Sequence, residues 1–346
     1  MLQPQNKKRF RLQLITKYAL ICLAVLFAIV LLVSIWGCLA MFWMPEQSYQ
    51  GQLPPLQAEE ITLQNSLQQD VNQLAAEIGI RNVSKYDQLN QAKDFLEASI
   101  AEAGYEVRLQ EYKIGGKLYY NIEAEHTGTG KPDEIIIVGG HYDSAFTSFG
   151  ANDNATGTAA TLELARLFSN KTTTRTIRFV EFTNEEPPFA GTEDMGSLVY
   201  AKQLRQRDEN IVAMLSLETM GYFSDKVGSQ TYPFPINLFY PNQGNFIGFV
   251  ANLESGDLLR KAIASFRRHT KFPSEGASLP DWIPGVGWSD HWSFWQQGYQ
   301  GIMVTDTAPY RYPYYHTEQD TPDKIDFDKL ARIVSGLAKV ISNLAE

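Results

Sequence analysis

Cysteine is scarce in this chain of 346 residues, and both examples lie near the N-terminus. Cys22 and Cys38 belong to one long apolar run, and no cysteine follows it. The rest of the chain therefore uses neither disulfides nor thiolate metal ligands. A metal site in that part must be built from histidine, aspartate and glutamate.

Charge is absent from residues 18–44, a stretch of 27 residues. As a helix it would span about 40 Å, enough to cross a hydrocarbon core of about 30 Å. Residues 1–17 hold five basic residues and no acid, and basic residues favour the cytoplasmic side. We therefore expect a basic cytoplasmic tail over 1–17 and a signal-anchor helix in the lipid bilayer over 18–44. The rest of the chain would lie outside the cytoplasm.

Two other interpretations of this N-terminal run remain open. A cleaved signal peptide is one, although its apolar region is normally only about 7–15 residues long. A lipoprotein site at Gly37-Cys38 is the other, but the apolar run continues past Cys38. Both features favour an uncleaved anchor.

Basic charge is also scarce beyond the tail. The whole chain has a net charge of −9, so the part after residue 17 carries −14, which argues against a nucleic-acid-binding surface. Residues 45–58 are rich in proline and glutamine and indicate a linker. We expect one globular domain over 59–346, and the sequence does not indicate its oligomeric state.

Hydrophobic patterns in this domain predict two helices, then a hairpin around Gly115-Gly116, then alternating strands and helices. Strands are expected over residues 134–140, 176–183, 211–217 and 301–306. The first of them is a continuous apolar run, which is typical of a strand buried on both faces. The pattern predicts a three-layer α/β/α fold with a mixed, mainly parallel central sheet.

Ionisable side chains follow three of these strands. His141 follows the first, Glu185 and Glu186 follow the second, and Glu218 follows the third. Open α/β sheets bind ligands at the carboxyl ends of their strands, so we expect these side chains to converge. Two adjacent acids repel each other unless a cation lies nearby. One of the pair can bind metal while the other takes a proton from water.

Other candidates lie in the connecting segments. Asp143 is placed to orient the ring of His141, and Asp153 in GANDNATG can bridge two metals. His316 lies in an aromatic loop. Asp290 and His291 in SDHWSF are expected to support the metal ligands without binding metal themselves. Each piece alone also has a structural interpretation. Asp153, for example, could simply cap the next helix.

Together the pieces indicate a site for two divalent cations. Asp153, Glu185, Glu186 and Glu218 contribute −4, and two Zn²⁺ ions would offset this charge. Without metal such a crevice would be strongly self-repelling. Metal-assisted hydrolysis is the chemistry that this set favours.

The motifs resemble the zinc aminopeptidase family that includes the secreted bacterial leucyl aminopeptidases, glutamate carboxypeptidase and glutaminyl cyclase. The resemblance covers roughly residues 60–345. It implies that His141 and Glu218 hold one zinc, that Glu186 and His316 hold the other, and that Asp153 bridges them.

The same resemblance implies that Glu185 is the general base and that Tyr315 steadies the oxyanion. It also implies a cis peptide bond between Asp153 and Asn154. The chain departs from the family at Glu218, where an aspartate is usual. The longer side chain could shift one zinc, so one ion in place of two remains open.

We therefore expect a membrane-anchored zinc exopeptidase acting on peptides, most simply an aminopeptidase because free amines suit acidic, metal-lined pockets. A glutaminyl cyclase with a single zinc is the first alternative. A non-catalytic binding module on the same fold is the second. Residues 222–245, rich in tyrosine, phenylalanine and proline, are expected to form a variable segment near the site.

Overall fold

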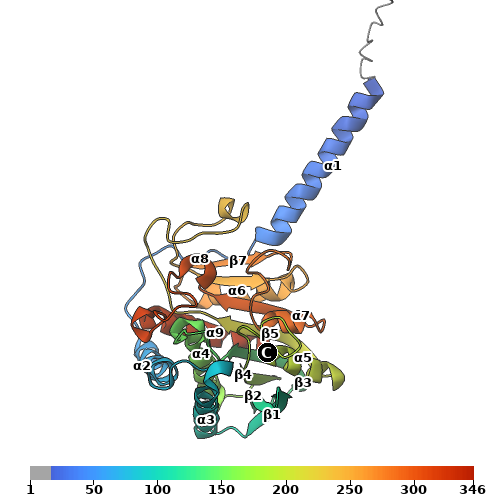
Figure 1. Cartoon of the computed structure of the whole chain (residues 1–346). Helices are drawn as coiled ribbons and strands as arrows, with labels where there is room; N and C mark the ends of the chain where they lie inside the picture. The colour runs from blue at the N-terminus through green and yellow to red at the C-terminus, as the bar shows by residue number, and fades with distance from the viewer. Residues whose placement is uncertain (1–16) are drawn as a thin grey trace, which may run out of the picture. The chain divides into compact units, whose positions relative to one another are not determined.

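The computed structural model describes residues 17–346 and divides the chain into two compact units, up to Trp43 and from Met44 onward (Figure 1). The N-terminal unit holds α1 (Lys17–Phe42), a helix of 26 residues with no buried side chain. Among the described residues, α1 alone is long and apolar enough to cross a membrane, with a mean hydropathy of 3.0. It fits the single-pass anchor expected over 18–44. The basic tail expected over 1–17 lies, except for Lys17, outside the described residues.

Within residues 17–346, the second unit is built on an eight-stranded sheet in the order β1-β2-β4-β3-β5-β8-β6-β7. The strands are β1 (Val107–Ile114), β2 (Lys117–His126), β3 (Lys131–His141), β4 (Arg175–Phe182), β5 (Asn210–Glu218), β6 (Ile247–Ala251), β7 (Ser274–Ser278) and β8 (Gly301–Thr305). Strands β4, β3, β5 and β8 run parallel, whereas β1 and β2 form an antiparallel hairpin and β6 runs antiparallel to β8. The predicted mixed, mainly parallel sheet is confirmed.

Helices cover both faces of this sheet, as predicted. One face packs against α2 (Ala58–Asn72), α3 (Tyr86–Glu102), α4 (Thr156–Phe168), α6 (Gly256–His269) and α9 (Phe327–Ala345), and the other against α5 (Gly196–Gln206) and α7 (His291–Trp295). Successive side chains of a strand point to opposite faces. Accordingly, Ile136 and Val138 of β3 join the first core, while Ile135 and Ile137 join the second.

Short helical turns complete the described elements. They are η1 (Gln73–Ile78), η2 (Val83–Lys85), η3 (Ala151–Ala155), η4 (Ile236–Leu238), α8 (Ala308–Arg311) and η5 (Pro322–Lys324). The hairpin turn at Gly115-Gly116 has positive φ at both residues, +56° and +91°. This is a conformation that glycine adopts readily, so the turn predicted there is confirmed.

The segment expected to be a linker, residues 45–58, belongs to the same compact unit as the domain. Its backbone is held by Arg267 of α6, whose Nη1 donates to the carbonyls of Pro45 and Glu46 at 3.1 Å each. The backbone N–H of Ser274 in β7 donates to Ser48 Oγ at 2.9 Å. The start of this segment therefore runs along the β7 edge of the sheet, where these contacts order it.

Candidate metal centre

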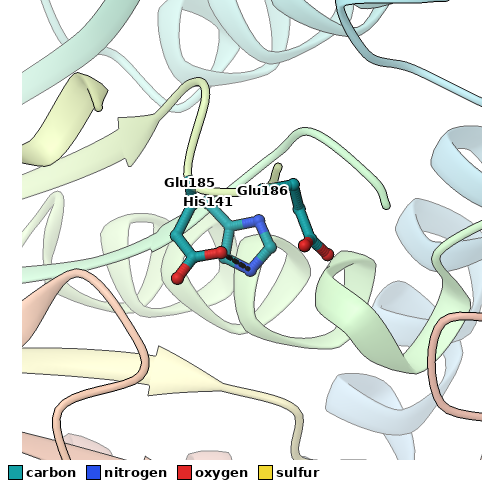
Figure 2. A group of neighbouring side chains, drawn as sticks. All are labelled: His141, Glu185 and Glu186. Carbon is teal, nitrogen blue, oxygen red and sulfur yellow. Dashed lines mark ion pairs between the residues drawn. The ribbon is translucent and has the colours of Figure 1, made fainter. Parts of the chain in front are cut away.

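The candidate ligands lie at the carboxyl edge of the parallel strands. His141 and Glu218 are the last residues of β3 and β5, and Glu185 and Glu186 follow β4 after a short turn. Because these three strands are parallel neighbours, their carboxyl ends share one edge. Figure 2 shows the carboxylate of Glu185 against the ring of His141, with Glu186 beside them.

Asp153 reaches the same place on a loop that is tied down at two points. Asp320 accepts hydrogen bonds from the backbone N–H groups of Asn152 and Asp153, at 2.8 and 3.1 Å. The side chain of Asn154 donates to Leu217 O at 2.8 Å and accepts from the N–H of Thr219 at 3.0 Å. The loop is thereby fixed to the end of β5. The Asp153–Asn154 peptide bond is cis, which confirms that expectation.

The carboxylate of Asp153 lies between two histidines, one on each oxygen. Its Oδ1 is 3.3 Å from His141 Nε2 and its Oδ2 is 3.0 Å from His316 Nε2. Glu218 Oε2 lies 3.3 Å from His141 Nε2, and Glu186 Oε1 lies 3.3 Å from His316 Nε2. The five residues thus form two groups of potential metal ligands that share Asp153, each with its ligand atoms within 4.8 Å of one another.

This donor set fits two divalent cations. His141 Nε2, Asp153 Oδ1, Glu186 Oε1 and His316 Nε2 are buried and make no hydrogen bond among the described residues. A buried polar atom without a partner costs about 1–3 kcal/mol, and a cation held between these atoms would remove that cost. Imidazole nitrogens and carboxylate oxygens are ordinary zinc ligands.

Burial sets the electrostatics of this cluster. It raises the pKa of Glu185 well above its ordinary range, and it raises the pKa of Glu186 to about 8, with the charge of Asp153 adding to the second effect. Burial also opposes ionisation of Asp153. The close imidazoles of His141 and His316, one on each carboxylate oxygen, outweigh it, so the pKa of Asp153 is lowered. The excess of acid calls for positive charge, which bound divalent cations would supply.

Asp143 holds the centre together from one side. Its Oδ1 is 3.4 Å from His141 Nδ1, and its two oxygens accept hydrogen bonds from the backbone N–H groups of Glu185 and Glu186, at 3.1 Å each. A single carboxylate therefore faces the imidazole of His141 and holds the backbone of both glutamates. Residue Asn184, which precedes the pair, has a left-handed φ of +58° that turns the chain toward the site.

Tyr315, Asp290 and His291 lie around the cluster without joining either group of ligands. The ring of Tyr315 stacks on His316 with centroids 3.8 Å apart. His291 is fully buried with Nε2 2.8 Å from Val286 O. Asp290 is also fully buried, and burial raises its pKa to about 7 while the charge of His141 acts in the opposite direction.

Three further residues that the sequence did not reveal support the centre. Arg81 is fully buried and donates to the carbonyls of Tyr142, Phe149 and Gly150, at 2.6, 2.7 and 2.8 Å, so it ties both ends of the loop that leads to Asp153. Asp320 holds the Asp153 backbone, and Ser289 Oγ donates to Glu218 Oε2 at 2.8 Å. Only Asp320 had a sequence signal, since it lies four residues after His316 in HTEQD.

A cleft of about 350 Å³ opens over the metal centre, and a smaller apolar cavity of about 100 Å³ adjoins it. The cleft is lined by the carboxylates of Asp153, Glu185, Glu186 and Glu218, and by Tyr315 and His316. Glu218, Trp288 and Tyr315 line both spaces, so the two are contiguous. Tyr232, Pro233, Ile236 and Tyr240 place the segment expected to be variable in the cavity wall.

The model of peptidase family M28 matches residues 121–341. The chain belongs to this family. Membership supports zinc as the metal of the centre described above. The uncharacterized protein YfbL of Escherichia coli (strain K12) is 34% identical over 286 residues, which cover 80% of this chain and 87% of that protein.

Solved structures with the same fold include two kinds of enzyme. The zinc aminopeptidase BSAP from Bacillus subtilis has a TM-score of 0.65 at 13% identity, covering 82% of this chain and 95% of that one. The glutaminyl cyclase from Fimbriiglobus ruber has a TM-score of 0.59 at 19% identity, covering 85% and 97%. The predicted zinc exopeptidase-like fold is confirmed. Because both enzymes share this fold, the fold does not determine the reaction, which depends on the residues of the site.

Proposed function

We propose that this M28 peptidase is a membrane-anchored exopeptidase that releases N-terminal residues from peptides with two zinc ions. The observation that carries the proposal is Asp153, whose two oxygens each face a different histidine. His141 and Glu218 complete one group of ligands, and Glu186 and His316 complete the other. A non-catalytic module would have no need of two complete groups.

Zinc held there would supply Lewis-acid chemistry, polarising a peptide carbonyl and lowering the pKa of water. Glu185 takes the proton from the attacking water and passes it to the leaving nitrogen. Glu185 lines the cleft, and its side chain is 13% exposed. Its carboxylate lies 3.7 Å from His141 Nε2. It can therefore meet a water and a substrate while Asp143 holds its backbone.

Tyr315 is placed to donate a hydrogen bond to the oxygen that becomes negative during the attack. It lines the cleft beside His316. The free α-amine of the substrate pairs with the acidic side of the cleft near Glu218. A free α-amine occurs only at the start of a peptide chain, which favours release of N-terminal residues.

The test of this mechanism is Glu185→Gln in the full chain, purified in detergent. Removing a general base typically costs about 10²–10⁴-fold in rate, so we expect kcat to fall by at least about 100-fold. Zinc content, measured by plasma mass spectrometry, should stay at two ions per chain. Near wild-type hydrolysis with both ions bound would refute the role of Glu185.

A glutaminyl cyclase is the second candidate. The observation that favours it is Asp290, which is fully buried near the centre in an environment that raises its pKa. A peptide with N-terminal glutamine separates the two reactions. Release of free glutamine supports the peptidase, whereas loss of ammonia with the peptide bond intact supports the cyclase. A single zinc per chain would also favour the cyclase.

The anchor is proposed to be uncleaved, with residues 1–17 in the cytoplasm and the catalytic unit outside it. The charge difference across α1 supports this orientation. Protease added to intact cells should digest the catalytic unit and leave a tag at the N-terminus protected. The opposite pattern would reverse the topology.

A further inference from the structure

The apolar cavity beside the metal centre has a floor made by four strands. Glu218 of β5 pairs with Thr305 of β8, Thr305 pairs with Gly248 of β6, and Gly248 pairs with Glu275 of β7. Residues paired across strands point to the same face of a sheet. The row therefore runs from a carboxylate at the metal centre to a second carboxylate on the edge strand, three strand spacings or about 14 Å away.

The space between these two carboxylates is apolar. The adjacent row of the floor is Met303, Val250 and Ala277, and Ile236 and Val286 line the same cavity. Gly248 contributes no side chain at the centre of the row. A Cβ there would lie 3.2 Å from Thr305 O and 3.4 Å from Thr307 Cγ2. A larger residue would be crowded there, so glycine keeps the centre of the cavity floor free of a side chain.

Glu275 is the charged group at the far end of the cavity. Its side chain is 24% exposed, and the nearest cation among the described residues is Arg267, with Nη2 3.9 Å from the carboxylate. Arg267 Nη2 and Nε already donate to Ser274 O and Ser274 Oγ, at 2.7 and 3.1 Å. Burial raises the pKa of Glu275, and the charge of Arg267 opposes this shift only in part.

We propose that Glu275 makes this cavity a pocket for a long basic side chain, so that lysine or arginine is the preferred N-terminal residue. The aliphatic stem packs over Gly248 and Val250, and the cation meets Glu275. Lysine and arginine are the side chains that combine an apolar stem with a charged end. This inference rests on the proposed aminopeptidase function, since the substrate amine must lie near Glu218.

The test compares amidomethylcoumarin substrates of lysine and norleucine, which have similar stems and differ in the terminal charge. With the full chain in detergent, kcat/KM should be higher for lysine by about tenfold, since a hydrogen bond to a charged group contributes about that much. Glu275→Gln should lower the value for lysine by about tenfold and leave norleucine within about twofold. Glu254→Gln, an exposed acid outside the cavity lining, is the matched control.

The outcomes separate this inference from the proposed function. If norleucine is cleaved as well as lysine, or if Glu275→Gln changes both substrates equally, the role of Glu275 is wrong while the peptidase stands. If the zinc-loaded wild type cleaves neither substrate nor any other N-terminal residue, both proposals fail. Retained norleucine hydrolysis also shows that Glu275→Gln is folded.

Discussion

The metal cleft and the apolar cavity share a boundary but are built in different ways. The cleft stands on the parallel strands β3, β4 and β5. Asp143 and Asp320 accept hydrogen bonds from the backbone of its acids, and Ser289 donates one to Glu218. The cavity stands on β6, β7 and β8, with a wall from residues 232–240. Catalytic groups need fixed positions, whereas a pocket needs mainly shape and one charge. Changes in the cleft should therefore affect all substrates, and changes in the cavity should affect the choice among them.

The largest expected effect comes from breaking the cleft at Asp153. In Asp153→Ala both groups of ligands lose a member, so we expect both zinc ions to bind at least about 100-fold more weakly. This loss of affinity exceeds the one that usually follows removal of a residue that only supports a ligand. Lysine and norleucine substrates should lose activity equally. Zinc content by plasma mass spectrometry measures the first effect. A variant that keeps two ions would show that Asp153 does not bridge them.

Arg81 tests how far the cleft depends on its support. Arg81→Met removes a guanidinium that serves several backbone carbonyls and leaves them unpaired in a buried place. We expect a loss of unfolding free energy of about 3–5 kcal/mol. Differential scanning fluorimetry in detergent should show a melting temperature lowered by several degrees. Exposed Arg268→Met is the control, and equal melting of the two variants would contradict this role.

Glu218 belongs to only one of the two groups of metal ligands, so its loss distinguishes them. Glu218→Ala removes a ligand only from the group formed by His141, Asp153 and Glu218. We therefore expect one zinc per chain, with the second ion kept by Asp153, Glu186 and His316. Glu218→Asp should keep two. Loss of both ions from Glu218→Ala would mean that the two groups do not bind independently.

The smallest effect should come from the cavity wall. Ile236→Ala removes part of the apolar lining, and at about 0.8 kcal/mol per methylene the KM for lysine and norleucine substrates should rise about tenfold. An alanine substrate, too short to reach the wall, should be unaffected. Zinc content should not change. A rise in KM for alanine as well would show that residue 236 acts on the cleft.

The structure agrees with the sequence most closely where the signals are local. Apolar runs marked β3, β4, β5 and β8, and the residues just after the first three are the ones that meet. Strands β6 and β7 were not predicted, and SEGAS in β7 has no apolar pattern that could have indicated a strand. Residues 45–58 were expected to be a linker because they are rich in proline and glutamine, which do not indicate packing against a core. In the structure Arg267 holds the backbone at the start of this segment.

The sequence by itself determined the parallel core, the apolar N-terminal helix and the residue types of a zinc site, because strand and helix periodicity are properties of neighbouring residues. The tertiary structure alone decided that Asp153 faces two histidines, that Arg81 supports its loop, and that Glu275 lies in register with Glu218. Pairing between distant strands sets such registers, and no local pattern in the chain encodes them.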